Sequence, residues 1–163
     1  ANQECFNWLS CVYQAYGGVP TKAQVTEYVE KTLSEGKVIP GFGHAVLRIV
    51  DPRYTEEKKF AEKYFPEDEM FKTALVVGEV VPKMLMKMGK AKNPWPNVDG
   101  LNGVLQNHFG VSQSDYYTVL FGLSRILGFT CHVVWARAVG KPIERPKALT
   151  TRMLETMISA DQN

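Results

Sequence analysis

The chain has 163 residues, of which 45% are hydrophobic and 22% are charged, and its formal net charge is +2 at pH 7. This length suits one domain rather than an enzyme with two large lobes, and the composition is that of an ordinary soluble globular protein. So small a positive charge gives no argument for nucleic-acid binding. We also expect no membrane span, because no apolar run approaches the roughly 20 residues that crossing a bilayer requires.

The cysteines point to a reducing compartment. Cys5, Cys11 and Cys131 form no CxxC pair and cannot all be paired within one chain. We therefore expect buried, unreactive thiols. No targeting peptide is visible, but the chain begins with Ala1 instead of Met and leads directly into an amphipathic pattern, so we interpret Ala1 as following an interior cut point.

The first part of the chain carries two helical patterns. Apolar residues at helical spacing predict a helix that ends at Gly17. Thr21 and Gln24 have the form of a capping box, which predicts a second helix that Gly36 ends. Residues 38–43, here called the glycine loop, contain proline and two glycines and are expected to be non-helical.

The middle of the chain predicts two further helices and a rigid loop. Thr55 is expected to cap a helix that Pro66 ends. The apolar segment 70–88 predicts a longer helix that Pro82 kinks. Residues 90–97, here called the proline loop, cannot be helical because two prolines fix φ.

Helical patterns also occupy the last third. They cover residues 98–109, 114–127 and 129–139, with a short terminal helix near Met153. Convincing alternation of period two is absent throughout, and no internal repeat is evident. The predicted fold class is therefore all-α.

Polar residues that a helical core does not require gather first around the glycine loop. Its glycines let the backbone approach a flat ligand, and His44 follows directly, where an imidazole can donate or accept a proton near neutral pH. Arg48 and Arg53 could bind carboxylates or phosphates in the bidentate manner of guanidinium groups. Taken alone, this motif also fits a capped helix start with solvated arginines.

Two later segments add to these candidates. Asp99, after the proline loop, could act as a base if water is excluded, or could simply begin a helix. Phe121 and Arg125 are four residues apart on one predicted helical face, with Arg145 downstream, an arrangement that suits a planar dicarboxylate. Aromatic residues at this spacing are equally typical of a core. Together the three segments predict a pocket for polyanionic substrates and acid–base chemistry.

Six stretches of the chain resemble citrate synthase of the eukaryotic, mitochondrial type, in that family's order and spacing. They are ANQE from Ala1, PGFGHAVLR from Pro40, DPRYT from Asp51, GKAKNPWPNVD from Gly89, YYTVLFGLSR from Tyr116 and ERPK from Glu144. The resemblance implies an all-α, homodimeric enzyme of the tricarboxylic acid cycle in the mitochondrial matrix. Such an enzyme condenses acetyl-CoA with oxaloacetate and hydrolyses citryl-CoA to citrate and CoA.

The resemblance also assigns roles to the candidate residues. Asp99 stands at the position of the base that deprotonates the acetyl methyl group, and His44 at that of the histidine that hydrogen-bonds and protonates the oxaloacetate carbonyl. The oxaloacetate-binding positions are Arg53, Phe121, Arg125 and, reaching into the other subunit, Arg145. The CoA-binding positions are the backbone of Val38, Ile39, Pro40, Gly41, Phe42 and Gly43 around the adenine, with Arg48, Lys90 and Lys92 at the phosphates. Acetyl-CoA is a substrate, and the resemblance implies no metal and no further cofactor.

The chain departs from the family pattern at its beginning. The family's other central histidine lies in a Pro-Leu-His-Gly motif three residues upstream of where Ala1 aligns, and that motif is not in this sequence. The resemblance makes residues 1–110 the small, CoA-binding domain and residues 111–163 the last helices of the large domain. We therefore expect a companion segment and a second subunit as partners, and an inactive chain without them.

Two other functions remain open from the sequence. The missing histidine is compatible with a non-catalytic CoA-binding or structural module. The acyl pocket is not evident, and one methylene contributes only about 1–3 kcal/mol of discrimination, so propionyl-CoA and 2-methylcitrate synthesis form the other alternative.

Overall fold

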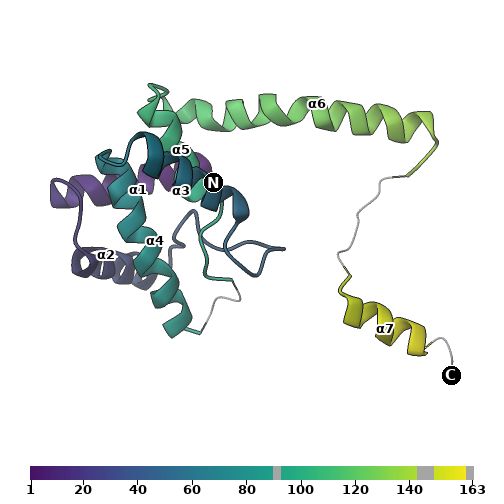
Figure 1. The fold of residues 1–163 in the computed structure, drawn as a ribbon, viewed down its shortest axis with the longest axis horizontal. Coiled ribbons are helices and arrows are strands. Elements are labelled where there is room, and N and C mark those ends of the chain that lie inside the picture. Colours follow the sequence, from purple (N-terminus) through teal and green to yellow (C-terminus); the bar gives the residue numbers. More distant parts are fainter. Residues whose placement is uncertain (90–92, 143–148, 161–163) are drawn as a thin grey trace. The chain divides into compact units, whose positions relative to one another are not determined.

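The computed structural model describes residues 1–89, 93–142 and 149–160, and the all-α class is confirmed over them (Figure 1). The helices are α1 (Asn2–Tyr16), α2 (Lys22–Ser34), α3 (Pro52–Tyr64), α4 (Glu69–Lys87), α5 (Asp99–His108), a 3₁₀ helix η1 (Ser114–Tyr116), α6 (Tyr117–Ala138) and α7 (Thr151–Ala160). Extended pairing in the described ranges is limited to one isolated antiparallel bridge, between Phe42 and Pro96.

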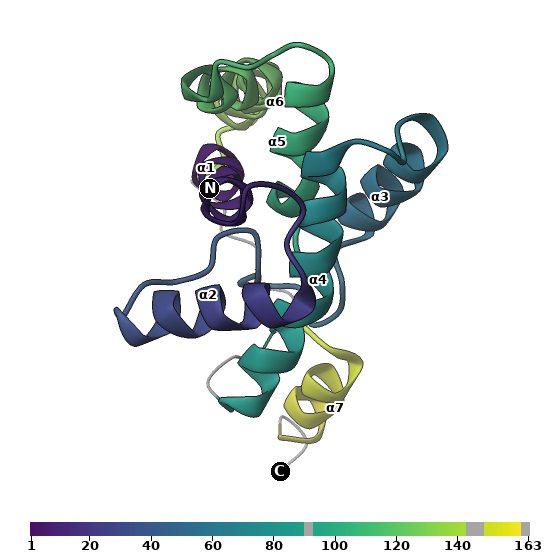
Figure 2. The ribbon, with the colours of Figure 1, turned by 90° about the vertical axis from the view of Figure 1, so that its left-hand side faces the viewer.

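The chain divides into two compact units, Ala1–Gly122 and Leu123–Asn163. The first contains α1 to α5, η1 and the beginning of α6, and the second contains the rest of α6 together with α7. Within the first unit, α4 and α5 lie between the other helices (Figure 2). Helix α5 contacts α1, α3 and α4, while α4 also contacts α1 and α2.

The core of the first unit is built where α1, α4 and α5 meet. Phe71, Leu101 and Tyr117 are its largest fully buried side chains, and each such burial contributes roughly 1.5–3 kcal/mol. The Tyr117 hydroxyl donates a hydrogen bond to the Val111 carbonyl oxygen at 2.7 Å. Its buried polar atom is thereby satisfied, so the tyrosine can start α6 inside the core.

Local signals in the sequence account for the first two helices. Gly17 takes φ 67° after the last residue of α1, in the left-handed region that glycine tolerates. The Thr21 hydroxyl accepts the Gln24 N–H while the Gln24 side chain accepts the Thr21 N–H, so the predicted capping box is confirmed.

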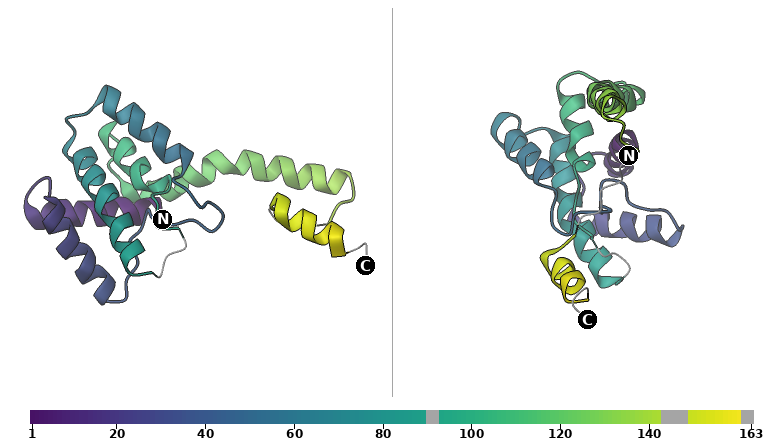
Figure 3. Two further views of the ribbon diagram at one scale, coloured as in Figure 1. Left: turned by 60° about the horizontal axis from the view of Figure 1, so that its bottom comes forward. Right: turned by 90° about the vertical axis from the view of Figure 1, so that its right-hand side faces the viewer.

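The predicted start of the third helix is wrong. Helix α3 begins at Pro52, and its cap is Asp51, whose carboxylate accepts the Arg53 N–H at 3.0 Å. Proline suits this first helical position because its missing N–H would have no partner there. The long irregular connection between α2 and α3 carries the glycine loop (Figure 3).

The two helices predicted over residues 114–127 and 129–139 form one continuous helix, α6. The helix continues through Gly128, since one interior glycine costs only about 1 kcal/mol relative to alanine. The continuous helix also bears on the expectation of no membrane span. Residues 114–138 form a helical stretch of 25 residues with mean hydropathy 1.5, long and apolar enough to cross a membrane by length and composition.

The cysteine expectation is confirmed at one position of three. Cys5 is buried, but Cys11 and Cys131 are exposed. Cys11 lies on the outer face of α1 and Cys131 on α6, so neither thiol is protected by packing within the part of the chain that the structure describes.

The contact between α1 and α5 supplies a stability test at Gly103. A Cβ atom there would lie 2.7 Å from the Phe6 Cβ and 2.9 Å from the Asn2 Oδ1. We expect Gly103→Ala to lower the free energy of unfolding by about 1–2 kcal/mol, because the overpacking exceeds the gain in helix propensity. Urea denaturation followed by circular dichroism measures this change. The matched control is Gly122→Ala in α6, where nothing lies within 4 Å of the added Cβ atom. An equal change in the free energy of unfolding in both variants would contradict the close packing of α1 on α5 at Gly103.

Candidate active site

Backbone hydrogen bonds join the glycine loop to the proline loop. The Gly43 N–H donates to the Trp95 carbonyl oxygen and the Asn97 N–H to the Gly41 carbonyl oxygen, both at 2.9 Å. The Asn97 side chain adds a third bond, from Nδ2 to the Gly43 carbonyl oxygen at 2.9 Å. Two of the three predicted segments are therefore held side by side, directly before Asp99.

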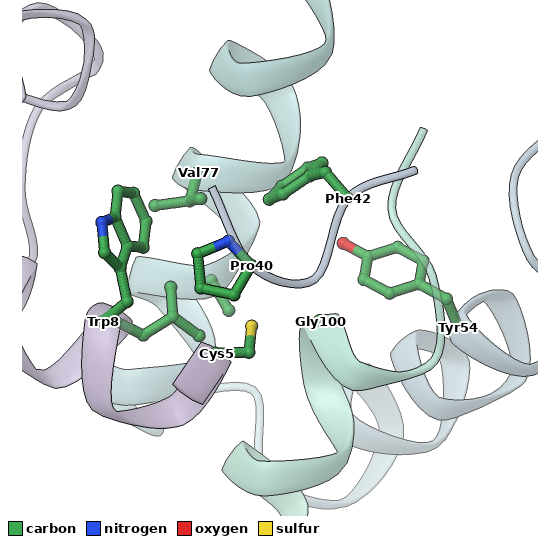
Figure 4. A pocket seen from close by; sticks show the side chains of 9 residues that line it. Cys5, Trp8, Pro40, Phe42, Tyr54, Val77 and Gly100 are labelled. Atoms are coloured by element: carbon green, nitrogen blue, oxygen red, sulfur yellow. The ribbon is translucent and has the colours of Figure 1, made fainter. Parts of the chain in front are cut away.

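Gly41 is the point where the glycine loop packs most closely on the helices. It takes φ 86°, and a Cβ atom there would lie 2.6 Å from the Cys5 Sγ and 3.2 Å from the Gly100 Cα. Figure 4 shows the Cys5 sulfur directed toward the loop between Pro40 and Phe42. The cavity left there has a volume of only about 10 Å³, room for one water at most. The loop therefore rests on a tightly packed floor formed by α1 and α5.

A buried carboxylate connects the start of α3 to the proline loop. Asp51 is 1% exposed and accepts two hydrogen bonds from the Arg53 guanidinium, from Nε at 3.0 Å and from Nη2 at 2.7 Å. It also accepts the Val98 N–H at 3.3 Å, and its own N–H donates to the Pro96 carbonyl oxygen at 3.3 Å. The bonds from Arg53 hold the pKa of Asp51 down to about 2, although burial acts in the opposite direction.

The ion pair with Asp51 orients the Arg53 guanidinium but leaves some of its N–H donors unused. Its side chain remains 55% exposed, and the bonds to Asp51 use only Nε and Nη2. A guanidinium has five N–H groups, so the Nη1 end can still bind a carboxylate.

Asp99 is the first residue of α5, as its helix-start interpretation requires, yet its carboxylate does not cap the helix. The Asp99 N–H instead donates to the Asn97 Oδ1 at 3.0 Å. Burial raises the pKa of Asp99, while the Ala1 amino group and Arg53 lower it and Asp51 raises it. A half-buried carboxylate with a raised pKa is a better base than an ordinary aspartate, so the catalytic interpretation gains a physical basis.

His44 lies in an exposed turn whose hydrogen bonds define its tautomer. Its Nδ1 accepts the backbone N–H groups of Val46 and Leu47, both at 3.0 Å. In a neutral imidazole the proton then resides on Nε2, which becomes the donor. Arg48 lies over the same turn, with Nη1 donating to the Leu47 carbonyl oxygen at 2.8 Å and to the Val46 carbonyl oxygen at 3.0 Å.

The residues predicted to surround adenine differ in their exposure. Val38 is 82% exposed, whereas Ile39 is 5% exposed and belongs to the core. The loop is thus anchored by one side chain while its neighbour faces solvent.

The third predicted segment lies across the division between the two units. Phe121 is 53% exposed at the end of the first unit, and Arg125 lies on α6 within the second unit. Lys90, Lys92 and Arg145 lie outside the described residues.

Three residues of the site were missed by the sequence analysis as functional candidates. Asp51 and Asn97 connect the loops, and Glu57 on α3 carries a buried Oε2 with no hydrogen-bond partner in the described ranges. Burial raises the pKa of Glu57 to about 8. Asp51 followed by proline is a sequence signal for a helix cap. The sequence does not distinguish Glu57 from a solvent-exposed glutamate of an amphipathic helix.

The arrangement supports acid–base chemistry on anionic substrates. It offers a carboxylate base, an imidazole Nε2–H donor and a fixed guanidinium, all carried by two joined loops and the helix starts beside them. Among residues 1–89, 93–142 and 149–160 no group of three His, Cys, Asp or Glu side chains is placed to hold a metal ion.

Comparison with known proteins identifies the class of this fold. The helices superpose on the crystal structure of citrate synthase from Thermotoga maritima with a TM-score of 0.69 and 26% sequence identity, over 91% of this chain and 38% of that one. The model of the citrate synthase C-terminal domain family matches residues 1–147. The chain therefore belongs to the citrate synthase family.

Two relatives show which type of citrate synthase the chain resembles. The mitochondrial citrate synthase of Citrus maxima is 52% identical over 95% of this chain, and that of Xiphias gladius is 48% identical over 98%. The expected mitochondrial type is confirmed by these names. The chain spans about a third of the length of both relatives, 33% and 34%.

The Asp51–Arg53 pair makes stability depend on pH. The pKa of Asp51 is lower in the folded chain than its usual 3.8, so the pair stabilises the fold fully above about pH 4, and this contribution is lost as the pH falls toward about 2. Because Arg53 is half exposed, we expect the contribution to be about 1–2 kcal/mol. Asp51→Asn should lower the free energy of unfolding at pH 7 and flatten its decline between pH 4 and pH 2.

Urea denaturation at several pH values measures both effects. Glu30→Gln on the exposed side of α2 is the control and should keep the wild-type acid decline. An unchanged decline in Asp51→Asn would show that another group is responsible.

Proposed function

We propose that this chain is the C-terminal portion of a citrate synthase, which condenses acetyl-CoA with oxaloacetate and hydrolyses citryl-CoA to citrate and CoA in the mitochondrial matrix. The observation that carries the proposal is the pairing of the glycine loop with the proline loop, since it holds His44 and Asp99 on joined segments. Family membership supports the substrates, because the family's motifs coincide with these segments.

Asp99 acts in this proposal as the base that removes a proton from the acetyl methyl group. A thioester methyl is a very weak carbon acid, so the enolate must be stabilised as it forms. The raised pKa of Asp99 supports the role, because it reduces the difference in pKa between the carboxyl group and the thioester methyl group that it deprotonates.

His44 polarises the oxaloacetate carbonyl and protonates its oxygen as the carbon–carbon bond forms. The hydrogen bonds that occupy Nδ1 support a neutral imidazole with its proton on Nε2, the form that can donate. Arg53 binds a substrate carboxylate, and its fixed contact with Asp51 reduces the entropy lost on binding.

The remaining assignments follow the family pattern. Phe121 and Arg125 would complete the oxaloacetate site and Arg145 would serve the other subunit of a dimer. Residues 38–43 would surround adenine, with Arg48, Lys90 and Lys92 at the phosphates and no metal or further cofactor involved. Following the family pattern, we place the end of the small, CoA-binding domain near residue 110, with residues 111–163 belonging to the large domain.

A companion segment supplies what this chain lacks, above all the second catalytic histidine. The apolar surface of α6 supports a large partner: Leu127 is 73% and Trp135 is 70% exposed. Protein rather than lipid accounts best for this helix, because Arg125 lies near its middle and a charge there is costly in a bilayer.

The role of Asp99 is tested in the assembled enzyme. We expect Asp99→Asn to lower the rate of citrate formation by about 10²–10⁴-fold, because the base is lost, and to change oxaloacetate affinity by less than about twofold. Thiol release from acetyl-CoA and calorimetric titration of oxaloacetate measure the two effects. Asp115→Asn, an exposed position in η1, is the control. A large loss of oxaloacetate affinity with chemistry preserved would mean that the role is misassigned.

The role of α6 is tested by association. Leu127→Glu should weaken binding of this chain to a companion carrying the other two thirds of the family sequence by about tenfold or more, because a charge would be buried against an apolar surface. Val19→Glu, in the turn between α1 and α2, is the matched control and should bind normally. Equal binding by both variants, or a folded chain that never requires a companion, would favour an independent CoA-binding module instead.

A further inference from the structure

Glu57 occupies a position beside the site that the mechanism does not use. It lies one helical turn after Arg53 on α3, so the two side chains are neighbours on one face. Its Oε2 atom is buried and has no hydrogen-bond partner within the described residues. A buried, unpaired carboxylate oxygen is costly to ionise, so this position requires an explanation.

The charges around Glu57 are unbalanced. Asp51 and Asp99 both raise its pKa and Arg53 lowers it, but burial is the largest cause of the rise to about 8. If all three carboxyl groups were ionised, they would share one guanidinium that already gives two hydrogen bonds to Asp51. Of the remaining groups nearby, Tyr54 stays neutral because burial raises its pKa to about 12.

Among the described residues, Arg53 is the cation that lowers the pKa of Glu57, although Lys59 and Lys63 line the same surface hollow. On α5, which contacts α3, the titratable side chains are Asp99 and His108, and the latter pairs with Asp68 at 2.8 Å. On α3 the charges beside Glu57 include Glu56 and Lys59, which pair with each other at 2.8 Å in solvent. Arg53 is thus the cation that governs this carboxyl group.

We propose that Glu57 is a positioning residue that acts through Arg53: its carboxyl group is uncharged while a dicarboxylate substrate binds, and once ionised it competes with that substrate for the guanidinium. The inference rests on the proposed function, since it assigns Arg53 to a substrate carboxylate. A neutral Glu57 leaves the Nη1 end of Arg53 to the ligand. An ionised Glu57 adds a negative charge where an anion must bind, in a partly buried setting that screens it weakly.

The consequence is a pH-dependent affinity for oxaloacetate. If the form with a protonated Glu57 is the one that binds, apparent affinity falls with the fraction of that form. In the wild-type assembled enzyme the KM for oxaloacetate should then rise by about tenfold between pH 7 and pH 9, with kcat changed much less.

The experiment compares KM and kcat across this pH range in wild type, Glu57→Gln and Glu56→Gln. Glu57→Gln removes the ionisation and should keep the KM for oxaloacetate nearly constant, whereas Glu56→Gln, the same chemical change at an exposed neighbour, should retain the wild-type rise. Glu57→Asp provides a second test if the amide variant is poorly folded, since it retains an ionisable group and should retain a rise. Thermal unfolding of each variant checks its fold.

The outcomes separate this inference from the proposed function. A wild-type enzyme that forms no citrate overturns the proposed function. Citrate formation with the same pH-dependent KM in wild type and Glu57→Gln overturns the role of Glu57 alone. A lower melting temperature without a change in the KM profile also overturns it, because Glu57 would then act only in packing.

Discussion

The hydrogen-bonded contact between the glycine loop and the proline loop is the constraint on which the rest of the site depends. The bonds between Gly43 and Trp95 and between Asn97 and Gly41 hold together segments about fifty positions apart in the chain. Asp51 extends this connection to α3 through the N–H of Val98. Because irregular backbone must satisfy its polar groups like any other, these bonds also explain how two loops can lie over a helical core with only one isolated β-bridge between them.

Much of the fold was predictable because its signals are local. The left-handed Gly17 and the capping box at Thr21 each act within one helical turn. The error at Thr55 has a physical origin, since Asp51 and Pro52 offered an equally local and stronger start signal, a capping carboxylate followed by proline at the first helical position. The break expected near Gly128 failed because one glycine does not overcome the hydrogen bonds of a long helix.

The candidate site was predictable as a set of residues but not as a geometry. Asp99 and His44 came from motifs, yet the tautomer of His44 depends on the amides of Val46 and Leu47. The electrostatic state of Asp99 and Glu57 depends on burial, which no spacing rule contains. The role of Asn97 could not be predicted, because its bond to the Gly43 carbonyl oxygen joins residues far apart in sequence.

Arg53 connects stability, binding and pH dependence in one side chain. Its pairing with a fully buried Asp51 fixes the guanidinium through Nε and Nη2, and the Nη1 end remains for a further anion. Burial and the charges of Asp51 and Asp99 favour the uncharged form of a second carboxyl group beside it, at Glu57. The ion pair at Asp51 and the uncharged form of Glu57 therefore limit the negative charge around Arg53, while Asp99 has to be ionised to act as a base.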